Sequence, residues 1–303
     1  VGTGDRGVVL INALIIVLVI AAVAAALLTR AEGARARAAQ AQAGAQLALY
    51  LDGVEGLLPG LIREPVRDGV SHPGQAWARQ GLGYDIDRGR VGVAMRDLQG
   101  GLNVNWLTRP DDIYAQEAFR QLFQEVDVPL SVLSAIADFV DPVGARGTGS
   151  YLARRPPIRP VGGPIALLPE LRQVEGMTEA YYDRLAPMLT ALPVDAKLNL
   201  NTAPKPVLRA ALAPFPAELI AETLARGADD PLQSMTAFRN RLIEILETED
   251  IDDLPVDRLG VHSDWFGAAL TAVLDGQQRR RQVVMQHRFG EDGGTRIRYR
   301  WSE

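Results

Sequence analysis

The chain has 303 residues, of which 32 are Lys or Arg and 37 are Asp or Glu, so its formal charge at pH 7 is −5. With 47% hydrophobic and 23% charged residues the composition is that of a folded protein, which excludes wholesale disorder. At roughly 100–200 residues per domain, the length suggests two folded units. The net acidity argues against a dedicated nucleic-acid binder, and the absence of cysteine excludes disulfides, thiolate metal sites and cysteine nucleophiles.

An uncharged apolar segment near the N-terminus predicts a membrane-spanning helix. Residues 8–28 contain no charged side chain, and a helix of this length spans about 31 Å, which matches the core of a bilayer. The Ala-rich sequence that follows has no proline before Pro59, so we expect one helix over residues 8–58. Its aqueous half carries an apolar stripe that should dock on a globular unit, formed by Leu47, Tyr50, Leu51, Val54, Leu57 and Leu58.

The sequence alone leaves the fate and orientation of this segment open. A cleavable secretory signal is the alternative to a stable anchor, because Ala22-Val23-Ala24 offers small residues for cleavage, although such signals have apolar regions of only about 7–15 residues. Arginines 30, 35 and 37 follow the apolar segment whereas Arg6 alone precedes it, so the positive-inside rule favours an inside C-terminus. Two polar units without a further apolar span instead favour an exported domain.

Alternating apolar and polar residues predict strands on both sides of a helical region. Residues 90–98, 282–289 and 296–301 follow the period of two, and the last two should form a hairpin. Residues 266–276 before the hairpin should add a third antiparallel strand to it. We expect this hairpin to gather Val283, Met285, His287, Ile297, Tyr299 and Trp301 on one face. Helices are predicted between the strand regions, at 111–126, 129–140, 168–174, 178–192, 204–213, 217–225 and 234–249. The pattern indicates an α+β fold in which a helical unit interrupts an antiparallel sheet.

The N-terminal region resembles the prepilins of type IV pili and the pseudopilins of type II secretion. A short leader ends in Gly7, and an apolar helix begins at the next residue and continues into an Ala-rich amphipathic half. The resemblance implies that a prepilin peptidase removes residues 1–7 by cutting after Gly7, and that it methylates Val8. Residues 8–28 would then be the transmembrane part of the long N-terminal helix.

One position departs from the usual pattern of that family. Most members carry a glutamate where this chain has Asn12. A carboxylate at the centre of a bilayer costs about 2.5–3.5 kcal/mol, and in the family its partner is the amine of a neighbouring subunit. Asn12 cannot neutralise that amine, and the K-type minor pseudopilin of type II secretion is the member that lacks the glutamate. The alternative is that Asn12 hydrogen-bonds to another helix in the membrane.

Three further strings are similar to the K-type pseudopilins and together cover most of the chain. They are Asp97-Leu98-Gln99-Gly100 with Leu102-Asn103-Val104-Asn105, then residues 168–182, and then Leu198-Asn199-Leu200-Asn201-Thr202-Ala203-Pro204. The resemblance implies a pilin-like domain at 59–109 and 256–303, interrupted at 110–255 by an all-helical domain related to helix-hairpin-helix modules. The asparagines themselves require no chemistry, because they can bond to nearby backbone, and Asn201 or Thr202 can cap the helix that Pro204 opens.

The resemblance also implies a function and partners. A K-type minor pseudopilin forms the tip and initiation complex of the periplasmic pseudopilus, which drives the export of folded proteins. It is anchored by a single span in the bacterial inner membrane, with its C-terminal domain in the periplasm. Its partners would be the I-type and J-type minor pseudopilins, the major pseudopilin, the inner-membrane assembly platform and the prepilin peptidase. We expect no enzymatic activity, because the sequence has no phosphate-binding loop, zinc-protease motif or nucleophile elbow.

Two alternatives belong to other classes of protein. One is a membrane-anchored periplasmic DNA-binding protein with a helix-hairpin-helix module, whose turn would be Gly176-Met177-Thr178; Glu175 and Glu179 beside this turn repel phosphate. The other is a type IV minor pilin. We expect no nucleic-acid partner, since acidic residues flank the turn that would hold the phosphate.

Calcium is the cofactor that the resemblance suggests. Asp138 and Asp141 stand where one calcium site of the family begins, but Arg146 occupies the position of an expected acidic ligand. Calcium requires six to eight oxygen ligands, so a site here depends on further donors.

A basic stripe near the C-terminus has two interpretations. It consists of Arg279, Arg280, Arg281, Arg296, Arg298 and Arg300. A solvated face or a charged edge that discourages aggregation is the simpler one. A salt-bridged contact with an acidic neighbouring pseudopilin is the other.

Overall fold

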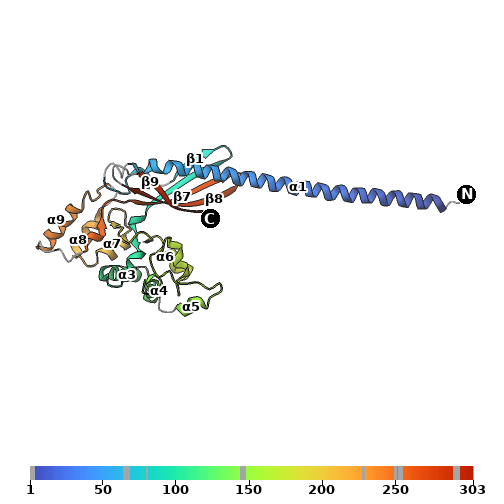
Figure 1. The fold of residues 1–303 in the computed structure, drawn as a ribbon. Helices are drawn as coiled ribbons and strands as arrows, with labels where there is room; N and C mark the ends of the chain where they lie inside the picture. The colour runs from blue at the N-terminus through green and yellow to red at the C-terminus, as the bar shows by residue number, and fades with distance from the viewer. Residues whose placement is uncertain are drawn as a thin grey trace.

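A very long helix leads into a globular region in which an antiparallel sheet lies beside a group of short helices (Figure 1). The computed structural model describes residues 4–63, 69–79, 81–143, 148–226, 229–248, 251, 255–288 and 294–302. The α+β class and the insertion of helices between strands were both predicted, and both are confirmed. The N-terminus lies at the far end of the long helix, away from the globular region (Figure 1).

The long helix α1 (Gly4–Leu61) extends beyond the predicted range of 8–58 at both ends. Its apolar part is exposed along its whole circumference and is long and apolar enough to cross a membrane. Pro59 was expected to end the helix, yet it lies inside the last turn. Proline at this position removes one hydrogen bond to the preceding turn, and the complete burial of Leu58 and Ile62 against the sheet compensates for that loss.

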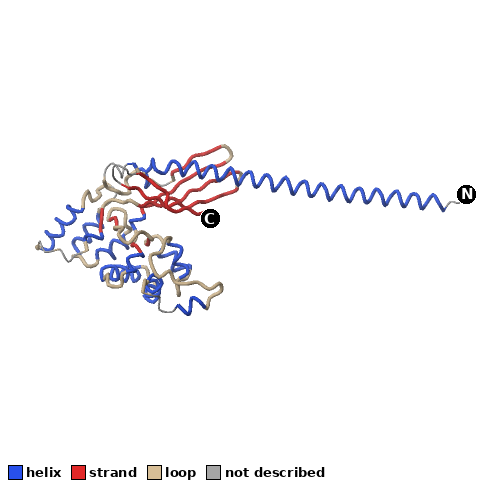
Figure 2. Tube along the Cα trace, viewed as in Figure 1, coloured by secondary structure: helices blue, strands red, loops and turns tan. Residues whose placement is uncertain are grey.

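The sheet has five antiparallel strands in the order β1-β2-β7-β8-β9. Their bounds are β1 (Leu82–Ile86), β2 (Gly89–Asp97), β7 (Trp265–Leu274), β8 (Gln277–Arg288) and β9 (Gly294–Ser302). The sequence patterns correctly predicted β2, β7, β8 and β9 but missed β1. The C-terminal half of α1 runs along one face of this sheet (Figure 2).

An apolar core holds α1 on the sheet. Leu47, Leu51 and Leu58 of the predicted stripe are buried, and Tyr50 and Val54 pack at its margin. The sheet contributes small residues such as Ala268 and Ala272, which let the helix approach closely. Its larger contributions are Met95, Phe266, Leu270, Leu274, Val283 and Met285. Each fully buried leucine contributes roughly 1.5–3 kcal/mol of transfer free energy, so this contact is strong enough to fix the helix on the sheet.

Two predicted faces differ from the structure. Leu57 is 70% exposed, because it lies one residue before the buried Leu58, and the rotation of about 100° between neighbouring helix residues points it away from the sheet. The hairpin does not gather its apolar residues on one face, because a β-bulge between Val284 and Met285 shifts the register of β9. As a result Tyr299 lies opposite Val284 and Trp301 opposite Gln282, on the face away from α1.

The inserted unit consists of short helices connected by loops. Its α-helices are α3 (Ile113–Glu125), α4 (Leu130–Val140), α5 (Thr148–Leu152), α6 (Glu179–Leu185), α7 (Lys205–Leu212), α8 (Ala217–Ala225) and α9 (Met235–Leu246). Five 3-10 helices are described along the chain: η1 (Ala76–Ala78), η2 (Leu98–Gly100), η3 (Val104–Thr108), η4 (Leu168–Gln173) and η5 (Val256–Arg258). Polar side chains cap the first turn of several of these helices. Asp112, for example, accepts a hydrogen bond from the Ala115 amide at 2.9 Å.

The helix predicted at 178–192 is too long. It ends at Leu185, and Leu189–Thr190 instead forms the short strand β4, which pairs in parallel with β3 (Leu102–Asn103). Pro187 explains the early end, because a proline has no amide N–H with which to continue the helical hydrogen bonds beyond Ala186. A second short parallel pair joins β5 (Leu198–Asn199) to β6 (Leu259–Gly260), so the inserted unit is not entirely helical.

The core of the inserted unit recruits residues from outside the predicted range of 110–255. Leu102, Val104 and Trp106 enter it before that range, and Leu259 and Val261 enter it afterwards. Their partners include Phe119, Phe123, Phe139, Leu171, Leu212, Phe238 and Leu242. The packing therefore joins two connecting segments to the helical unit: residues 102–106, which follow β2, and residues 259–261, which precede β7.

Candidate functional site

The residues predicted for processing and membrane contact lie at the far end of α1. The backbone at Gly7 and Val8 is helical, and Asn12 follows on the exposed apolar part of the same helix. No polar contact to the side chain of Asn12 occurs within the part of the chain that the structure describes. Cleavage after Gly7 and methylation of Val8 therefore stay predictions, and Asn12 is available to groups outside this chain.

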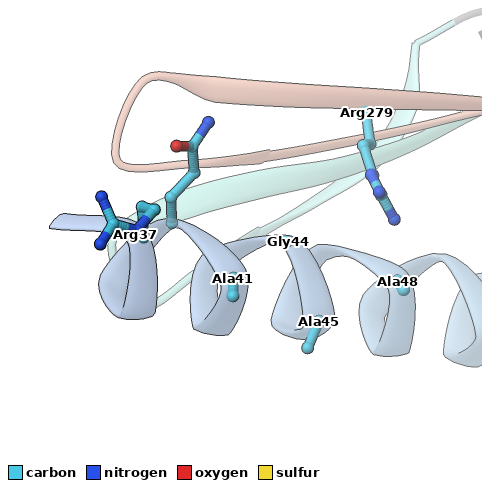
Figure 3. Close-up of a pocket in the computed structure, with 7 residues that line it drawn as sticks. Arg37, Ala41, Gly44, Ala45, Ala48 and Arg279 are labelled. Atoms are coloured by element: carbon cyan, nitrogen blue, oxygen red, sulfur yellow. The ribbon is translucent and has the colours of Figure 1, made fainter. Parts of the chain in front are cut away.

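A groove of about 530 Å³ runs between α1 and the start of β8 (Figure 3). Its floor consists of small residues one helical turn apart, and arginines from the two elements stand at its sides. The lining residues are Arg37, Gln40, Ala41, Gly44, Ala45, Ala48 and Arg279. The side chain of Arg279 reaches from β8 toward the helix (Figure 3). Small side chains at this spacing permit close approach of another helix.

A cluster of charged side chains lies next to that groove, in the contact of α1 with the sheet. Arg281 Nη1 of β8 lies 2.6 Å from Asp52 Oδ1 and 2.8 Å from Glu55 Oε2. Arg300 Nη1 of β9 lies 3.2 Å from Glu55 Oε1. These two members of the basic stripe thus face α1, which corrects the prediction of a uniformly solvated stripe. Glu55 was not singled out from the sequence, although its position one turn after Leu51 could have indicated it.

Asp97, at the end of β2, forms the centre of the junction between the sheet and the inserted unit. Its Oδ2 accepts hydrogen bonds from Asn199 Nδ2 at 2.9 Å, Thr202 Oγ1 at 2.6 Å and Ser263 Oγ at 2.5 Å. Its Oδ1 accepts one from the Gln99 amide at 2.7 Å. Burial raises the pKa of Asp97, while these hydrogen bonds act in the opposite direction.

The amide side chain of Asn199 connects three separate segments at this junction. It is completely buried, and its Nδ2 also donates to the carbonyl of Ser71 at 3.1 Å and to Ser263 Oγ at 2.9 Å. Its Oδ1 accepts a hydrogen bond from the amide of Asn201 at 3.0 Å. Gln99 adds a further link, because its Oε1 accepts from the amide of Asp264 at 2.7 Å.

The asparagines of the first Leu-Asn string have the same structural role. Asn103 Oδ1 accepts from the amide of Leu192 at 3.1 Å, and Asn105 exchanges two hydrogen bonds with the backbone of Ile165. Both asparagines are buried. The prediction that these asparagines bond to nearby backbone is confirmed, and the partners lie 60 to 90 positions away in the sequence.

The predicted helix cap at Asn201 or Thr202 is wrong. The residue before α7 is Pro204, and it makes no side-chain cap. Asn201 instead holds the loop that leads to α9, since its Oδ1 accepts from the Leu232 amide at 2.7 Å. Thr202 is committed to Asp97. Sequence spacing cannot distinguish a local cap from these tertiary contacts, because both need the same side-chain chemistry.

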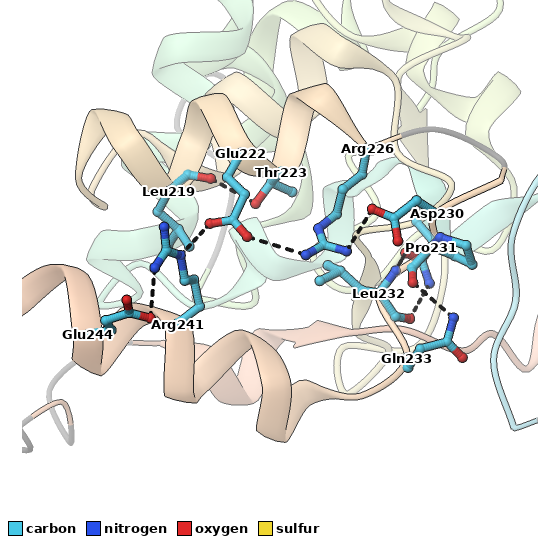
Figure 4. A network of polar contacts seen from close by, with 11 residues as sticks. Leu219, Glu222, Thr223, Arg226, Asp230, Pro231, Leu232, Gln233, Arg241 and Glu244 are labelled. Atoms are coloured by element: carbon cyan, nitrogen blue, oxygen red, sulfur yellow. Dashed lines mark hydrogen bonds and ion pairs between the residues drawn. The ribbon is translucent and has the colours of Figure 1, made fainter.

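Ion pairs connect the last two helices of the inserted unit (Figure 4). Glu222 of α8 lies between two arginines: Arg241 Nε of α9 is 2.6 Å from its carboxylate, and Arg226 Nη2 is 3.3 Å away. Arg241 and Arg226 hold the pKa of Glu222 below its usual value. These side chains are 30–41% exposed, so the ion pairs add little to stability and serve to align α8 and α9.

The candidate calcium ligands do not come together with further acids. Asp138 lies near the end of α4, and Asp141 follows that helix and accepts a hydrogen bond from the Val143 amide at 2.9 Å. Within the described residues, no group of three or more His, Asp or Glu side chains is placed to hold a metal ion. Arg146 lies outside the described residues. Two carboxylates supply fewer oxygen ligands than calcium needs. The calcium site that the resemblance suggests stays a prediction, and it depends on further donors.

The turn predicted for a helix-hairpin-helix is present between η4 and α6. Gly176 has a φ of +77°, and Thr178 caps α6 by accepting from the Tyr181 amide at 3.2 Å. Glu179 at the start of α6 forms an ion pair with Arg172 at 2.7 Å. The basic residue nearest this turn is therefore already neutralised, which leaves little for a phosphate to bind.

Comparison with known proteins gives a consistent result. Residues 100–194 match the family model described as type II secretion system (T2SS), protein K. The chain is 33% identical to type II secretion system protein K of Pseudomonas aeruginosa, covering 97% of this chain and 92% of the relative. It is 27% identical to the protein of the same name from Klebsiella pneumoniae, covering 97% and 96% of the two chains.

A solved structure has the same fold. It is a chain in the crystal structure of the GspK-GspI-GspJ complex from the type 2 secretion system of enterotoxigenic Escherichia coli, with a TM-score of 0.72, 22% identity, and coverage of 88% of this chain and 99% of that chain. At this identity the match concerns the fold. The identity and coverage of the P. aeruginosa relative carry the assignment further: this chain belongs to the family of type II secretion system protein K, the K-type minor pseudopilins.

Proposed function

We propose that this minor pseudopilin is anchored in the bacterial inner membrane by the apolar half of α1 and carries its globular region in the periplasm, at the tip of the pseudopilus. The observation that supports this role is the division of α1 into two halves. The first half is apolar and contacts nothing else in the described chain, whereas the second is docked on the sheet. One rigid helix thus joins a membrane anchor to a folded head.

The inserted unit supports a position at the end of a fibre. It adds α3 to α9 beside the sheet and makes the head much wider than the helix that carries it (Figure 1). Subunits inside a helical fibre pack on all sides, so such a head is best accommodated where nothing lies above it. Asn12 agrees with this position, because it cannot neutralise the terminal amine of a subunit in the usual register.

The partners that we propose are other minor pseudopilins of the I and J types, together with the major pseudopilin and the inner-membrane assembly platform. The solved structure of the same fold is part of a complex with GspI and GspJ. On this chain the groove between α1 and β8 provides a surface that another helix could occupy. In this proposal the protein acts in assembly and catalyses no reaction.

A secretion assay tests the proposal. The gene is deleted in its native host, and export of type II substrates is compared with that of a strain that produces the chain from a plasmid. We expect export to be lost and then restored, and we expect I-type and J-type pseudopilins to co-purify with a tagged chain. Normal export in the deletion strain, or loss of a type IV pilus instead, would contradict it.

A further inference from the structure

A second surface cleft lies on the opposite side of the sheet from α1. It has a volume of about 540 Å³ and is formed between the sheet and the loop before β5. Phe266 and Met285, which lie opposite each other in β7 and β8, face α1, so their neighbours Trp265 and Gln286 face the cleft. The lining residues on which the argument depends are Asp195, Lys197, Trp265, Arg288, Arg298 and Tyr299.

Cationic side chains outnumber carboxylates in this cleft. Lys197, Arg288 and Arg298 are exposed, and no ion pair among the described residues includes any of them. Arg298 is nevertheless held in place, because its Nε and Nη2 donate to Gln286 Oε1 at 3.0 and 2.6 Å. Two carboxylates, Asp195 and Asp264, also line the cleft, so the cations outnumber the acids by three to two.

The strand that borders the cleft is the edge of the sheet. Among the described strands β9 pairs with β8 alone, and residues 296–300 are all exposed. An edge strand presents unpaired amide and carbonyl groups to which another extended chain can bond. The opposite edge, β1, has only five residues, whereas β9 has nine. The longer edge thus coincides with the cationic cleft.

The bulge between Val284 and Met285 determines which side chains of β9 lie on the α1 side of the sheet and which lie on the cleft side. Arg300 lies opposite Val283 and is bound to Glu55 of α1, so it is committed within the protein. Tyr299 lies opposite Val284 on the other face, where it lines the cleft and is 43% exposed. The basic stripe therefore has two parts: Arg281 and Arg300 form ion pairs with α1, whereas Arg298 faces the cleft.

We propose that the edge of β9 binds an extended, acidic segment of another polypeptide as a sixth strand. Every second side chain of such a segment would point to the cleft side of the sheet, where its carboxylates would meet Arg298, Arg288 and Lys197. The intervening side chains would lie on the α1 side near Ile297, which is 42% exposed. This inference goes beyond the tip function and does not depend on it.

The cleft favours an acidic peptide over a nucleic acid. Asp195 and Asp264 would repel a continuous phosphate backbone, and the whole chain carries a net charge of −5. A peptide can place a carboxylate at alternate positions only and can bond to the strand edge with its backbone. One peptide would then bind to the cleft with its side chains and to the strand edge with its backbone.

The proposal is tested with the full chain in detergent micelles and fluorescent ten-residue peptides, by fluorescence anisotropy. The probe alternates Thr and Glu, and its comparison peptides alternate Thr with Lys or with Gln. We expect the Thr-Glu peptide to bind about tenfold more tightly than either, because its carboxylates pair with the three cations of the cleft, whereas the backbone bonds are common to all three peptides. A Thr-Glu peptide with two prolines, which cannot pair along the edge, should bind about tenfold more weakly. A single-stranded oligonucleotide should not displace the Thr-Glu peptide.

Substitutions locate the site. The combined variant K197Q/R288Q/R298Q should bind the Thr-Glu peptide about tenfold more weakly, while R280Q, which removes an exposed arginine elsewhere on β8, should leave binding unchanged. All four residues are exposed, so these variants should fold, and their thermal melting curves check this. Equal binding of the proline-containing peptide, equal loss in R280Q, displacement by the oligonucleotide, or no binding of the Thr-Glu peptide would each overturn the proposal.

Discussion

Arg281 of β8 and Glu55 of α1 form an ion pair of 2.8 Å between helix and sheet, with side chains that are only 12% and 9% exposed. The pair connects the helix that carries the membrane anchor to the sheet of the head. Because both charges are removed from water, each depends on the other for compensation. The direction of α1 relative to the head is thus determined by charge as well as by the leucines around it.

Removing one member of this pair should destabilise the head strongly. We expect E55A to lower the free energy of unfolding by about 2 kcal/mol, since the buried Arg281 would keep only Asp52, whose side chain is 56% exposed, as its partner. R300A should cost less than about 1 kcal/mol, because Arg300 is 62% exposed. Denaturant unfolding of the full chain in micelles, followed by tryptophan fluorescence, measures both. The double variant E55M/R281M should recover most of the loss; equal effects of E55A and R300A would contradict this account.

Asn199 should be among the most sensitive positions in the protein. N199A removes an amide that bonds to Ser71, Asp97 and Ser263, and leaves these buried groups without that partner. We expect a loss of about 3 kcal/mol in the free energy of unfolding, compared with about 1 kcal/mol for N103A, whose side chain bonds only to backbone groups, those of Asn105, Leu192 and Pro193. Thermal and denaturant unfolding of the two variants side by side measure the difference. A smaller effect at Asn199 than at Asn103 would contradict it.

Asp97 should make stability depend on pH in a defined direction. Burial raises its pKa in the folded state above the unfolded value of about 3.9, so the folded state binds more protons between these two values. The contribution of Asp97 to stability is therefore complete below the unfolded pKa and falls as the pH rises through the folded pKa. Subtracting the unfolding free energy of D97N from that of the unaltered chain, across the acid range, isolates this contribution. A difference that increases with pH would show that the hydrogen bonds outweigh burial.

Calcium should have little effect on the described part of the helical unit. Asp138 and Asp141 offer two carboxylates where six to eight oxygen ligands are needed. We expect the melting temperature of the full chain to be the same in calcium and in a chelator. A higher melting temperature in calcium that is lost in D138N/D141N would demonstrate a site that includes other donors.

The periodic elements of this fold were predictable because their signals are local. The apolar span, the amphipathic stripe with Leu47 and Leu51, and the alternation in β2 all follow from the arrangement of neighbouring residues. The short helix α8 matches its predicted range, since Pro216 precedes it and an amphipathic pattern fills it. The family resemblance of the asparagine strings also indicated the order of the two units.

The remaining features depend on contacts that no local pattern contains. The bulge that turns Tyr299 away from α1 depends on how β9 pairs with β8, and the short strand β4 after α6 depends on the pairing of Leu189 with Leu102. Asn201 was expected to cap a helix but holds Leu232, because a cap and a tertiary contact need the same amide group. The junction at Asp97 joins residues more than 100 positions apart, so it becomes visible only in the folded chain.

The assignment as a pseudopilin is tested most directly by mass spectrometry of the mature N-terminus, on protein purified from the native host's membrane. Processing by a prepilin peptidase predicts that the chain starts at Val8 and that its amine carries a methyl group. A mutant in which Gly7 is replaced by a bulky residue should retain residues 1–7. A mature chain that begins near Ala24, or one that keeps its leader, would contradict the central claim.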